Sequence, residues 1–239
     1  MLHFDSVSST SDLALEVASD PAQIGTVVLA EEQTAGRGRL GRGWLCPRGA
    51  GVLMSLTIQP PQRFDRPEIL TAWAAVAVAE TIRQATGVPA RIKWPNDVLL
   101  RGRKVAGILI ERKSLVVAGI GLNVSQSAEW FDAADLPAAG SLASVIGRNF
   151  DRDAVAQQLI DQLDADYSSL LDGELAVLES RWGWHLGMLG RLVELELLDG
   201  ERARGQLREL TFDRLALELP SGATSVWQPI QVRHLRRIE

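Results

Sequence analysis

The chain has 239 residues, 30 acidic and 25 basic side chains, a formal net charge of −5 and 46% hydrophobic residues. These values are typical of a soluble globular protein with one large domain, or one large and one small domain, and they exclude collagen-like, disordered and low-complexity chains. The single cysteine, Cys46, excludes an intramolecular disulfide. There is no apolar run of the roughly 20 residues that a membrane helix needs, and residues 1–11 lack the pattern of a signal peptide. We therefore expect a cytoplasmic protein with no membrane partner.

Lysine is scarce in this chain. Of the 25 basic residues, 22 are arginine, and the lysines are Lys93, Lys104 and Lys113. Codon bias alone can produce such a ratio. A second interpretation is that a lysine marks a place where a compact ammonium is needed and a planar guanidinium would not serve.

Strand and helix patterns alternate up to about residue 186. Short apolar or alternating runs predict strands at 2–7, 26–30, 52–58, 91–94, 98–101, 104–111 and 115–124. Residues 8–12 supply possible N-caps for a helix that ends at residue 18. Capping residues and apolar spacings of three or four predict further helices at 68–86, 153–171 and 175–184. Residues 33–51 fit neither period, so we expect a long loop there, of a kind that is usually functional or mobile.

After Gly187 the pattern contains strands only. They are predicted at 191–198, 203–210, 215–219, 225–226 and 232–238, which is typical of a small barrel. Roughly 50 residues form a marginal core by themselves, so we expect the barrel to pack on the preceding part of the chain. The predicted domains are residues 1–186 and residues 187–239.

The loop 33–51 is rich in glycine and arginine. Gly36 to Gly41 formally match the G-x-G-x-x-G pattern of dinucleotide-binding proteins, but the expected helix and acidic residue do not follow. Arg37, Arg39 and Arg42 have no acidic residue near them in sequence, since none occurs from position 33 to position 64. Such a loop suits phosphate or carboxylate binding. The alternative is a solvated surface loop.

A second segment, residues 91–97, places Lys93 at a strand end and Asn96 and Asp97 in the turn that follows. An amide and a carboxylate beside a cation can form part of a site. The same residues are also ordinary turn formers, so this segment by itself favours neither interpretation.

A third segment contains glycines inside two predicted strands. Gly119 and Gly121 alternate onto the same face, which a ligand lying across a bare strand would explain. The alternative is a bulge or close sheet packing. Strict alternation places Lys104 and Gly107 on opposite faces, so we expect Lys104 to act from the end of its strand.

Together these segments resemble the successive motifs of biotin–protein ligases. The matching stretches read QTAGRGRLGRGW, KWPND, KVAGILIE and GIGLN, in the same order and spacing. The resemblance implies an α+β fold with a central mixed β-sheet flanked by helices, related to class II aminoacyl-tRNA synthetases, and a small C-terminal SH3-like β-barrel. It also implies that residues 1–186 form the biotin- and ATP-binding catalytic domain.

The activity that the resemblance implies has two steps. Biotin and ATP give biotinyl-5′-AMP and pyrophosphate, and a lysine of the biotin carboxyl carrier domain of a carboxylase then accepts the biotin. Mg²⁺ accompanies ATP, and no protein metal ligand is expected. We expect no nucleic-acid partner, and a monomer or weak homodimer.

The resemblance also implies the roles of individual residues, although Ser11 departs from the asparagine that is usual at its position. The catalytic residues are Lys104, Arg37, Arg39 and Asp97. The biotin-binding residues are Ser9, Thr10, Ser11, Gln33, Arg37, Gly38, Arg39, Lys104, Gly107 and Gly119. The nucleotide-binding residues are Arg37, Arg39, Arg42, Trp44, Lys93, Asn96, Lys104 and Asn123.

Three other classes of protein compete with this interpretation. A lipoate–protein ligase shares the fold and the adenylation chemistry. A transcriptional regulator would carry an N-terminal helix-turn-helix, and we expect a short form without that module because Ser9 already falls in the catalytic domain. An inactive biotin-binding homologue is disfavoured by the presence of both Lys104 and Asp97.

Overall fold

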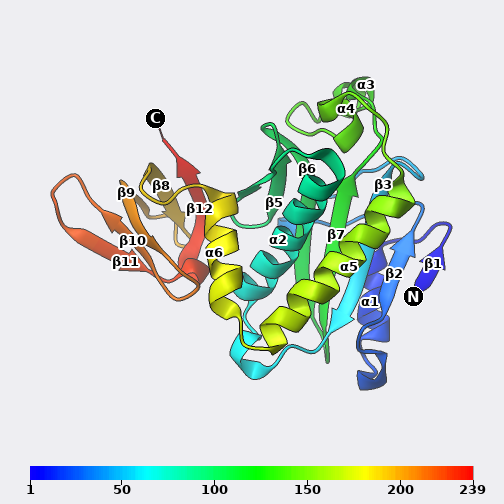
Figure 1. The fold of residues 1–239 in the computed structure, drawn as a ribbon, viewed down its shortest axis with the longest axis horizontal. Coiled ribbons are helices and arrows are strands. Elements are labelled where there is room, and N and C mark those ends of the chain that lie inside the picture. Colours follow the sequence, from blue (N-terminus) through cyan, green and yellow to red (C-terminus); the bar gives the residue numbers. More distant parts are fainter. Residues whose placement is uncertain (239) are drawn as a thin grey trace.

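The computed structural model describes residues 1–238 and contains a seven-stranded sheet with the order β1-β2-β3-β7-β6-β5-β4 (Figure 1). β1 and β2 are parallel and all other neighbours are antiparallel, so the sheet is mixed. The strands are β1 (Leu2–Phe4), β2 (Val27–Ala30), β3 (Gly51–Ile58), β4 (Arg91–Lys93), β5 (Asp97–Leu100), β6 (Arg103–Arg112) and β7 (Val116–Asn123).

Helices cover both faces of this sheet. α2 and α5 pack against each other on one face, with α6 beside α2, and α1 packs on the other face over β2, β3 and β7 (Figure 1). Within residues 1–238, no helix combines the length and the hydrophobicity needed to cross a lipid bilayer. The helices are α1 (Thr10–Val17), α2 (Pro67–Thr86), α3 (Ala128–Ala133), α4 (Leu142–Ile146), α5 (Arg152–Leu171) and α6 (Leu175–Leu186).

α2 is the central helix of the main core. Pro67 lies in its first turn, where no backbone donor is needed, and Gly87 ends it with a φ of 74° that other residues rarely adopt. Its middle is rich in alanine, and these side chains are fully buried. Small side chains let the helix approach the sheet closely, so α2 supports the strands that carry the candidate site on their other face.

The C-terminal strands form a separate antiparallel sheet with the order β11-β10-β9-β8-β12. Nε1 of Trp94 donates to the carbonyl oxygen of Val232 at 3.0 Å, and the rings of Trp182 and Phe212 stack with centroids 5.0 Å apart. These contacts pack the barrel against the main sheet and α6. Its strands are β8 (Leu192–Leu197), β9 (Arg202–Leu210), β10 (Leu215–Glu218), β11 (Thr224–Trp227) and β12 (Val232–Arg237).

The structure confirms the predicted fold class, a mixed sheet flanked by helices with a small C-terminal barrel. Two helices, α3 and α4, have no counterpart among the predicted elements. They have six and five residues, which is too few to show a helical period. Their N-caps, Ser127 and Ser141, gave no clear signal because serine is also common in loops. The strand predicted at 2–7 ends at Phe4, because the chain turns there toward α1.

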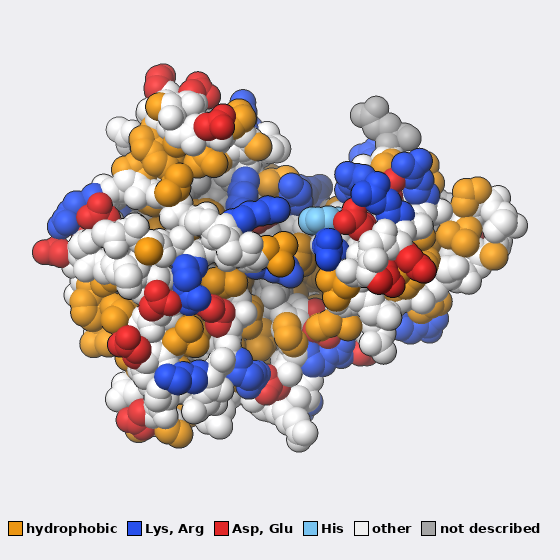
Figure 2. Space-filling view, turned by 180° about the vertical axis from the view of Figure 1, so that it is seen from behind, with side chains coloured by type: hydrophobic (Ala, Val, Ile, Leu, Met, Phe, Trp, Pro, Cys, Tyr) orange, Lys and Arg blue, Asp and Glu red, His pale blue; other side chains and the backbone are white. Residues whose placement is uncertain are grey.

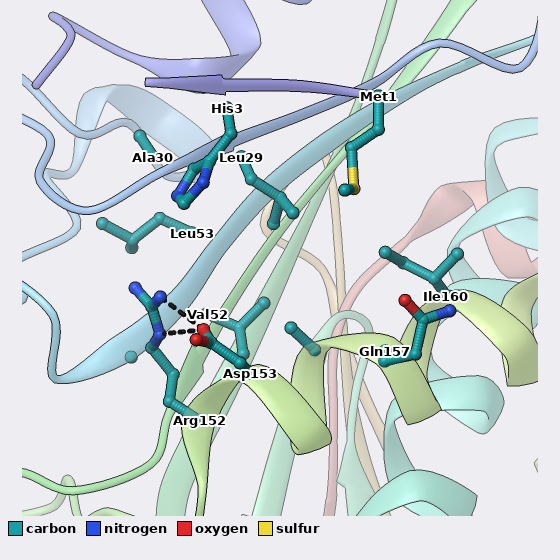
Figure 3. Close-up of a pocket in the computed structure, with 12 residues that line it drawn as sticks. Met1, His3, Leu29, Ala30, Val52, Leu53, Arg152, Asp153, Gln157 and Ile160 are labelled. Carbon is teal, nitrogen blue, oxygen red and sulfur yellow. Dashed lines mark hydrogen bonds and ion pairs between the residues drawn. The ribbon is translucent and has the colours of Figure 1, made fainter. Parts of the chain in front are cut away.

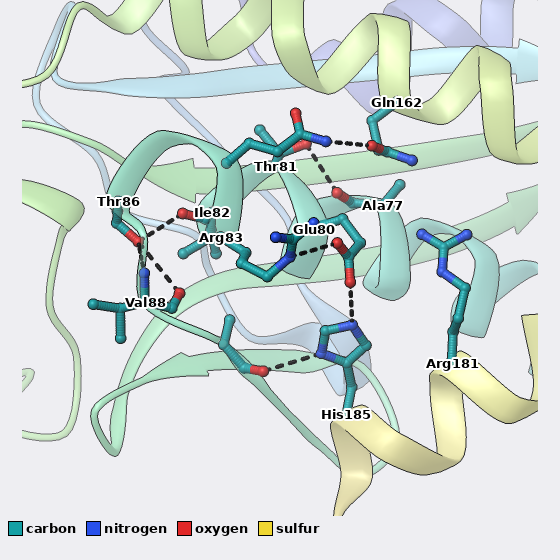
Figure 4. A network of polar contacts seen from close by, with 12 residues as sticks. Ala77, Glu80, Thr81, Ile82, Arg83, Thr86, Val88, Gln162, Arg181 and His185 are labelled. Carbon is teal, nitrogen blue, oxygen red and sulfur yellow. Dashed lines mark hydrogen bonds and ion pairs between the residues drawn. The ribbon is translucent and has the colours of Figure 1, made fainter.

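A buried polar network joins α2, α6 and the start of β4 (Figure 4). The ring of His185 is fully buried, with Nδ1 3.0 Å from the carbonyl oxygen of Ala90 and Nε2 3.0 Å from Oε1 of Glu80. Arg83 donates from Nε to Oε2 of Glu80 at 2.8 Å. Burial raises the pKa of Glu80, but the hydrogen bonds and charges of Arg83 and His185 outweigh it, so the pKa lies below its usual value.

We predict that Glu80→Gln lowers the free energy of unfolding by about 2 kcal/mol at pH 7, because hydrogen bonds to a charged group are lost. Since folding depresses the pKa of Glu80, this stabilisation is fully present above the unfolded value of about 4.3 and is lost as the pH falls through the folded value. Urea unfolding between pH 7 and pH 3 should therefore show the two proteins converging in acid. A difference that stays constant across this range would contradict the prediction.

Candidate active site

The candidate site lies on the face of the sheet that α1 covers. On β7, Gly119, Gly121 and Asn123 alternate onto this face, and Gly107 of β6 pairs directly opposite Gly121. Glycine has no side chain, so these positions leave space above the central strands. Side chains from α1, from the loop 33–51 and from β6 reach into that space.

A polar cluster stands at the start of α1. Ser9 is the N-cap, and its Oγ accepts from the backbone N–H of Ser11 at 3.2 Å. Oγ1 of Thr10 and Oγ of Ser11 lie 2.9 and 3.1 Å from Oγ of Ser55, on β3. Oε1 of Gln33 accepts from both the N–H and the hydroxyl of Thr10, at 2.7 and 2.9 Å. The fold thus gathers the polar residues predicted to bind biotin into one cluster.

Protein side chains fill the space above the glycines. A Cβ on Gly119 would lie 2.5 Å from Oγ of Ser11, and a Cβ on Gly121 would lie 2.6 Å from Nε1 of Trp44. In this structure Ser11 and Trp44 therefore lie over the bare strand face where a ligand was predicted. Both side chains come from segments far away in the sequence, so only the fold could reveal this.

Trp44 occupies the middle of the site. Its ring lies against Gly121 and Gly107, and Nζ of Lys104 is 5.7 Å from the ring centroid. Its Nε1 is buried and has no hydrogen-bond partner within residues 1–238. A buried, unpaired donor is costly, so a ligand that takes this space breaks no hydrogen bond of the ring.

Lys104 forms an ion pair with Asp97, with Nζ 2.6 Å from Oδ1. The pairing of β5 with β6 shifts register here, which makes Val105 an extra, bulged residue. The bulge places Lys104 on the same face as Gly107, whose Cβ would lie 3.6 Å from Nζ. The prediction that Lys104 and Gly107 face opposite ways is wrong, because the bulge resets the alternation between them.

The glycine-rich loop folds as a hairpin. The N–H of Gly38 donates to the carbonyl oxygen of Arg42 at 2.7 Å, and Leu40 at the tip has a φ of 58° and is 79% exposed. A cavity of about 570 Å³ runs along this hairpin, with Leu109 and Glu111 of β6 on its far side. The hairpin thus holds its arginines beside a space large enough for a small ligand.

Arg37 has acidic partners from two other elements. Its Nη2 lies 2.9 Å from Oδ1 of Asp12 on α1 and 2.8 Å from Oε2 of Glu111 on β6. Both acids lie outside residues 33–64, which contain none. The two acids neutralise Arg37 beside the cavity, so an incoming anion must compete with them.

Arg39 reaches the turn between β4 and β5. Its Nη1 donates to Oδ1 of Asn96 at 3.3 Å, and Nδ2 of Asn96 donates to the carbonyl oxygen of Ile108 at 2.8 Å. Desolvation lowers the pKa of Arg39 and the charge of Asp97 raises it, but a guanidinium stays charged throughout the physiological range. Asn96 therefore connects the arginine hairpin to β6.

The other predicted residues surround this centre. Lys93 pairs directly opposite Asp97 and its side chain is exposed, as is that of Arg42 on the hairpin. Asn123 follows Gly121 on the same face of β7. The fold therefore places the predicted residues of all segments on one face of the sheet or at its rim.

Two residues of this site, Ser55 and Asp12, are not among the residues predicted from the sequence. Ser55 is fully buried on β3, where it contacts Thr10 and Ser11. A polar residue in the middle of an otherwise mostly apolar strand was the signal that could have identified it. Asp12 gave no such signal, because an acid in the first turn of a helix is ordinary.

A second cavity, of about 200 Å³, lies between α5 and the strands β2 and β3 (Figure 3). Met1, Leu29 and Ile160 supply apolar walls. Arg152 donates to both carboxylate oxygens of Glu31, at 2.6 and 2.8 Å, and its hydrogen bonds hold the pKa of Glu31 below the usual range. Arg152 is already paired with Glu31, and no predicted site residue lines this cavity. It is therefore not the candidate site.

Within residues 1–238 no group of three or more His, Cys, Asp or Glu side chains is arranged to hold a metal ion. Cys46 lies half-buried after the hairpin, and burial raises the pKa of its thiol to about 11. The thiol is therefore protonated at neutral pH and does not serve as a nucleophile.

Basic side chains gather along the hollow between the main body and the barrel, on the face opposite to that of Figure 1 (Figure 2). Around the candidate site, Arg39, Arg42, Lys93 and Arg103 are exposed. A concave surface lined by one sign of charge raises the local concentration of ligands of the opposite sign. The surroundings of the site therefore favour anions.

The fold is that of solved biotin protein ligases. The biotin protein ligase from Aquifex aeolicus in complex with biotin and ATP matches with a TM-score of 0.80 and 26% identity, covering 99% of this chain and 98% of that one. Biotin--[acetyl-CoA-carboxylase] ligase of Mycobacterium tuberculosis is 35% identical over 96% of this chain and 86% of its own length. Bifunctional ligase/repressor BirA of Bacillus subtilis is 35% identical over 84% of this chain, which spans only 63% of that relative.

Residues 3–125 match the model of the biotin/lipoate A/B protein ligase family. This range contains the polar cluster, the arginine hairpin, the Lys104–Asp97 pair and the glycine-bearing strands. The chain belongs to the biotin/lipoate A/B protein ligase family.

We predict that Gly121→Ala expels the Trp44 ring from its place, because the added methyl group would overlap it. The fluorescence of Trp44 is isolated by subtracting the signal of a matching Trp44→Phe protein. Quenching of this fluorescence by acrylamide should increase. Gly183→Ala is the control, since a Cβ at Gly183 meets no atom within 4 Å. Equal quenching in the Gly121 variant and the wild type would contradict this placement of Trp44.

Proposed function

We propose that this protein is an ATP-dependent biotin–protein ligase. It activates biotin to biotinyl-5′-AMP with release of pyrophosphate, and then transfers biotin to a lysine of the biotin carboxyl carrier domain of a carboxylase. The observation that carries the proposal is the ion pair of Lys104 with Asp97 on the glycine-bearing face, beside Trp44 and near the arginine hairpin. Family membership and the names of the relatives support it.

The first step brings two anions together. A carboxylate oxygen of biotin attacks the α-phosphorus of ATP, and the bond to pyrophosphate breaks. Arg37 and Arg39 screen the repulsion and stabilise charge that develops at phosphorus. Lys104 is a compact point charge that follows one oxygen from carboxylate to mixed anhydride, whereas a guanidinium would favour a two-oxygen partner.

The second step forms the amide. The amine nitrogen of the carrier lysine attacks the acyl carbonyl, the bond to AMP breaks, and the amine loses a proton. Asp97 accepts this proton or orients the amine, and general-base assistance of this kind is worth roughly 10²- to 10⁴-fold. Its ion pair with Lys104 keeps Asp97 beside the reacting carbonyl.

The polar cluster at the start of α1 binds the ureido ring of biotin. Ser9, Thr10, Ser11 and Gln33 offer both donors and acceptors in a buried place, which is how small-molecule pockets fix orientation. Ser55 completes the cluster through Thr10 and Ser11. The valeryl chain then passes beside Gly119 and over Gly107 toward Lys104, with the Trp44 ring moved aside.

The nucleotide lies toward the hairpin and the end of β7. Arg42, Trp44, Lys93, Asn96 and Asn123 surround it, and the hairpin closes over the adenylate to keep water out. Mg²⁺ bound with ATP would supply positive charge that neutralises the phosphates.

The choice of biotin over lipoate follows from the chemistry of the cluster. Hydroxyls and an amide match a ureido ring, whereas the dithiolane of lipoate offers no comparable hydrogen bonds. The relatives with the best-matched lengths are named for biotin. We place the enzyme in the cytoplasm, where ATP is available.

The test is transfer of a label to a carrier domain. The protein is incubated with ATP, Mg²⁺, labelled biotin and a carrier domain, and mass spectrometry should find one biotin on the acceptor lysine. Omission of ATP is the control. Transfer of lipoate instead of biotin would establish the alternative, and transfer of neither would refute the proposal.

We predict that Lys104→Arg lowers the rate of biotinyl-AMP formation by about 10²-fold, because a displaced charge no longer meets the reacting oxygen. Pyrophosphate release measures this step. Lys113→Arg is the matched control, since Lys113 is an exposed residue in the turn between β6 and β7. Wild-type rates for Lys104→Arg would contradict the role of Lys104.

We predict that Arg39→Ala releases biotinyl-AMP about tenfold faster, because the loss of a charge-assisted hydrogen bond is worth on the order of 1.4 kcal/mol. Release of labelled adenylate into a trap measures the rate. Arg48→Ala is the control, because Arg48 lies in the same loop but pairs with Asp5 at the surface. An unchanged release rate for Arg39→Ala would count against closure of the hairpin over the adenylate.

A further inference from the structure

Asn123 ends the row of residues that face the site on β7. It lies two positions beyond Gly121, over which Trp44 sits, and its side chain is 3% exposed. Two positions along a strand correspond to roughly 7 Å. The amide of Asn123 therefore lies within reach of a planar ligand that takes the place of the Trp44 ring.

The amide of Asn123 is held in one orientation. Its Nδ2 donates to the carbonyl oxygen of Gly140 at 3.0 Å, and its Oδ1 accepts from Nε2 of Gln126 at 3.0 Å. A side-chain amide has two donor hydrogens and two acceptor lone pairs. These contacts use one of each, so one donor and one acceptor remain for a ligand.

The side chain of Gln126 is buried and only partly satisfied. It is 3% exposed, its backbone carbonyl accepts from Oγ of Ser141 at 2.6 Å, and its Nε2 also lies 3.2 Å from Sγ of Cys46. Its Oε1 is buried without a hydrogen-bond partner in the described part of the chain. An unpaired buried acceptor indicates that this pair of amides is not purely structural.

We propose that Gln126 is a positioning residue that fixes the orientation of the Asn123 amide and so makes the site select adenine over 6-oxopurines. This inference rests on the proposed function and concerns its nucleotide. Adenine presents an amine donor beside a ring-nitrogen acceptor, which matches the free Oδ1 and Nδ2 of Asn123.

On the ring edge that carries N1, a 6-oxopurine reverses the pattern, with a carbonyl acceptor beside an N–H donor. Asn123 would have to flip to receive it. The flipped amide would set its oxygen against the carbonyl oxygen of Gly140 and its NH₂ group against Nε2 of Gln126, so both existing hydrogen bonds would become repulsive. Gln126 thus contributes one of the two repulsive contacts that disfavour a 6-oxopurine.

The experiment compares ATP with ITP in biotinyl-AMP or biotinyl-IMP formation, by kcat/KM for each nucleotide, with the KM for biotin measured alongside. Gln126→Met keeps the shape and removes both polar groups, and Gln126→Glu keeps the shape and removes the donor. The ratio of ATP to ITP should fall about tenfold in each, the effect of one lost hydrogen bond. The KM for biotin should stay unchanged. Ser125→Ala is the control, because its exposed hydroxyl bonds only the backbone of Ala50.

If the ratio of kcat/KM for ATP to kcat/KM for ITP is unchanged in both Gln126 variants, the inference is overturned. It is also overturned if turnover, biotin affinity and thermal stability all fall while this ratio stays constant. A wild-type enzyme that uses ITP as well as ATP would also overturn it while leaving the proposed function standing. Failure of the wild type to form an adenylate with either nucleotide would refute the proposed function, and this inference with it.

Discussion

The candidate site depends on the absence of side chains at Gly107, Gly119 and Gly121. Only a bare surface on β6 and β7 admits the start of α1 over one glycine and the Trp44 ring over the next. A Cβ at Gly119 would collide with Oγ of Ser11, and a Cβ at Gly121 would collide with the Trp44 ring. The polar cluster, the aromatic ring and the lysine can therefore share one face of the sheet because that face has no side chains of its own.

The cations of the site are paired with carboxylates. Lys104 is paired with Asp97, and Arg37 with Asp12 and Glu111, so cations that could bind anions are kept close to neutral until a ligand arrives. Pairing restrains these long side chains and lowers their mutual repulsion. The same carboxylates are then available when a cationic or protonated group approaches, which suits a reaction that begins with two anions and ends with an amine losing a proton.

The support for this face comes from the other side of the sheet. The alanine-rich α2 packs closely under the strands, and the Glu80–His185 pair joins it to α6 and thereby to the barrel. Trp94 extends this connection, since it lies in the turn that leads to Asp97 and donates to Val232 of the barrel. Packing on the helix-covered face thus determines where the Asp97 turn stands on the site face.

The sequence by itself determined the elements and the chemistry of the site: apolar periods located the long helices and central strands, and the ordered motifs identified the arginine loop, Lys104, Asp97 and the polar residues before α1. Only the tertiary structure decided which groups meet. The bulge at Val105 turns Lys104 onto the face of Gly107, Trp44 and Ser11 cover the glycines, and Asp12 and Glu111 neutralise Arg37. Periodicity reports local backbone geometry. A register shift depends on how distant segments pack, and so do the ion pairs of Arg37, whose partners lie 25 and 74 positions away in the sequence. No local pattern encodes such contacts.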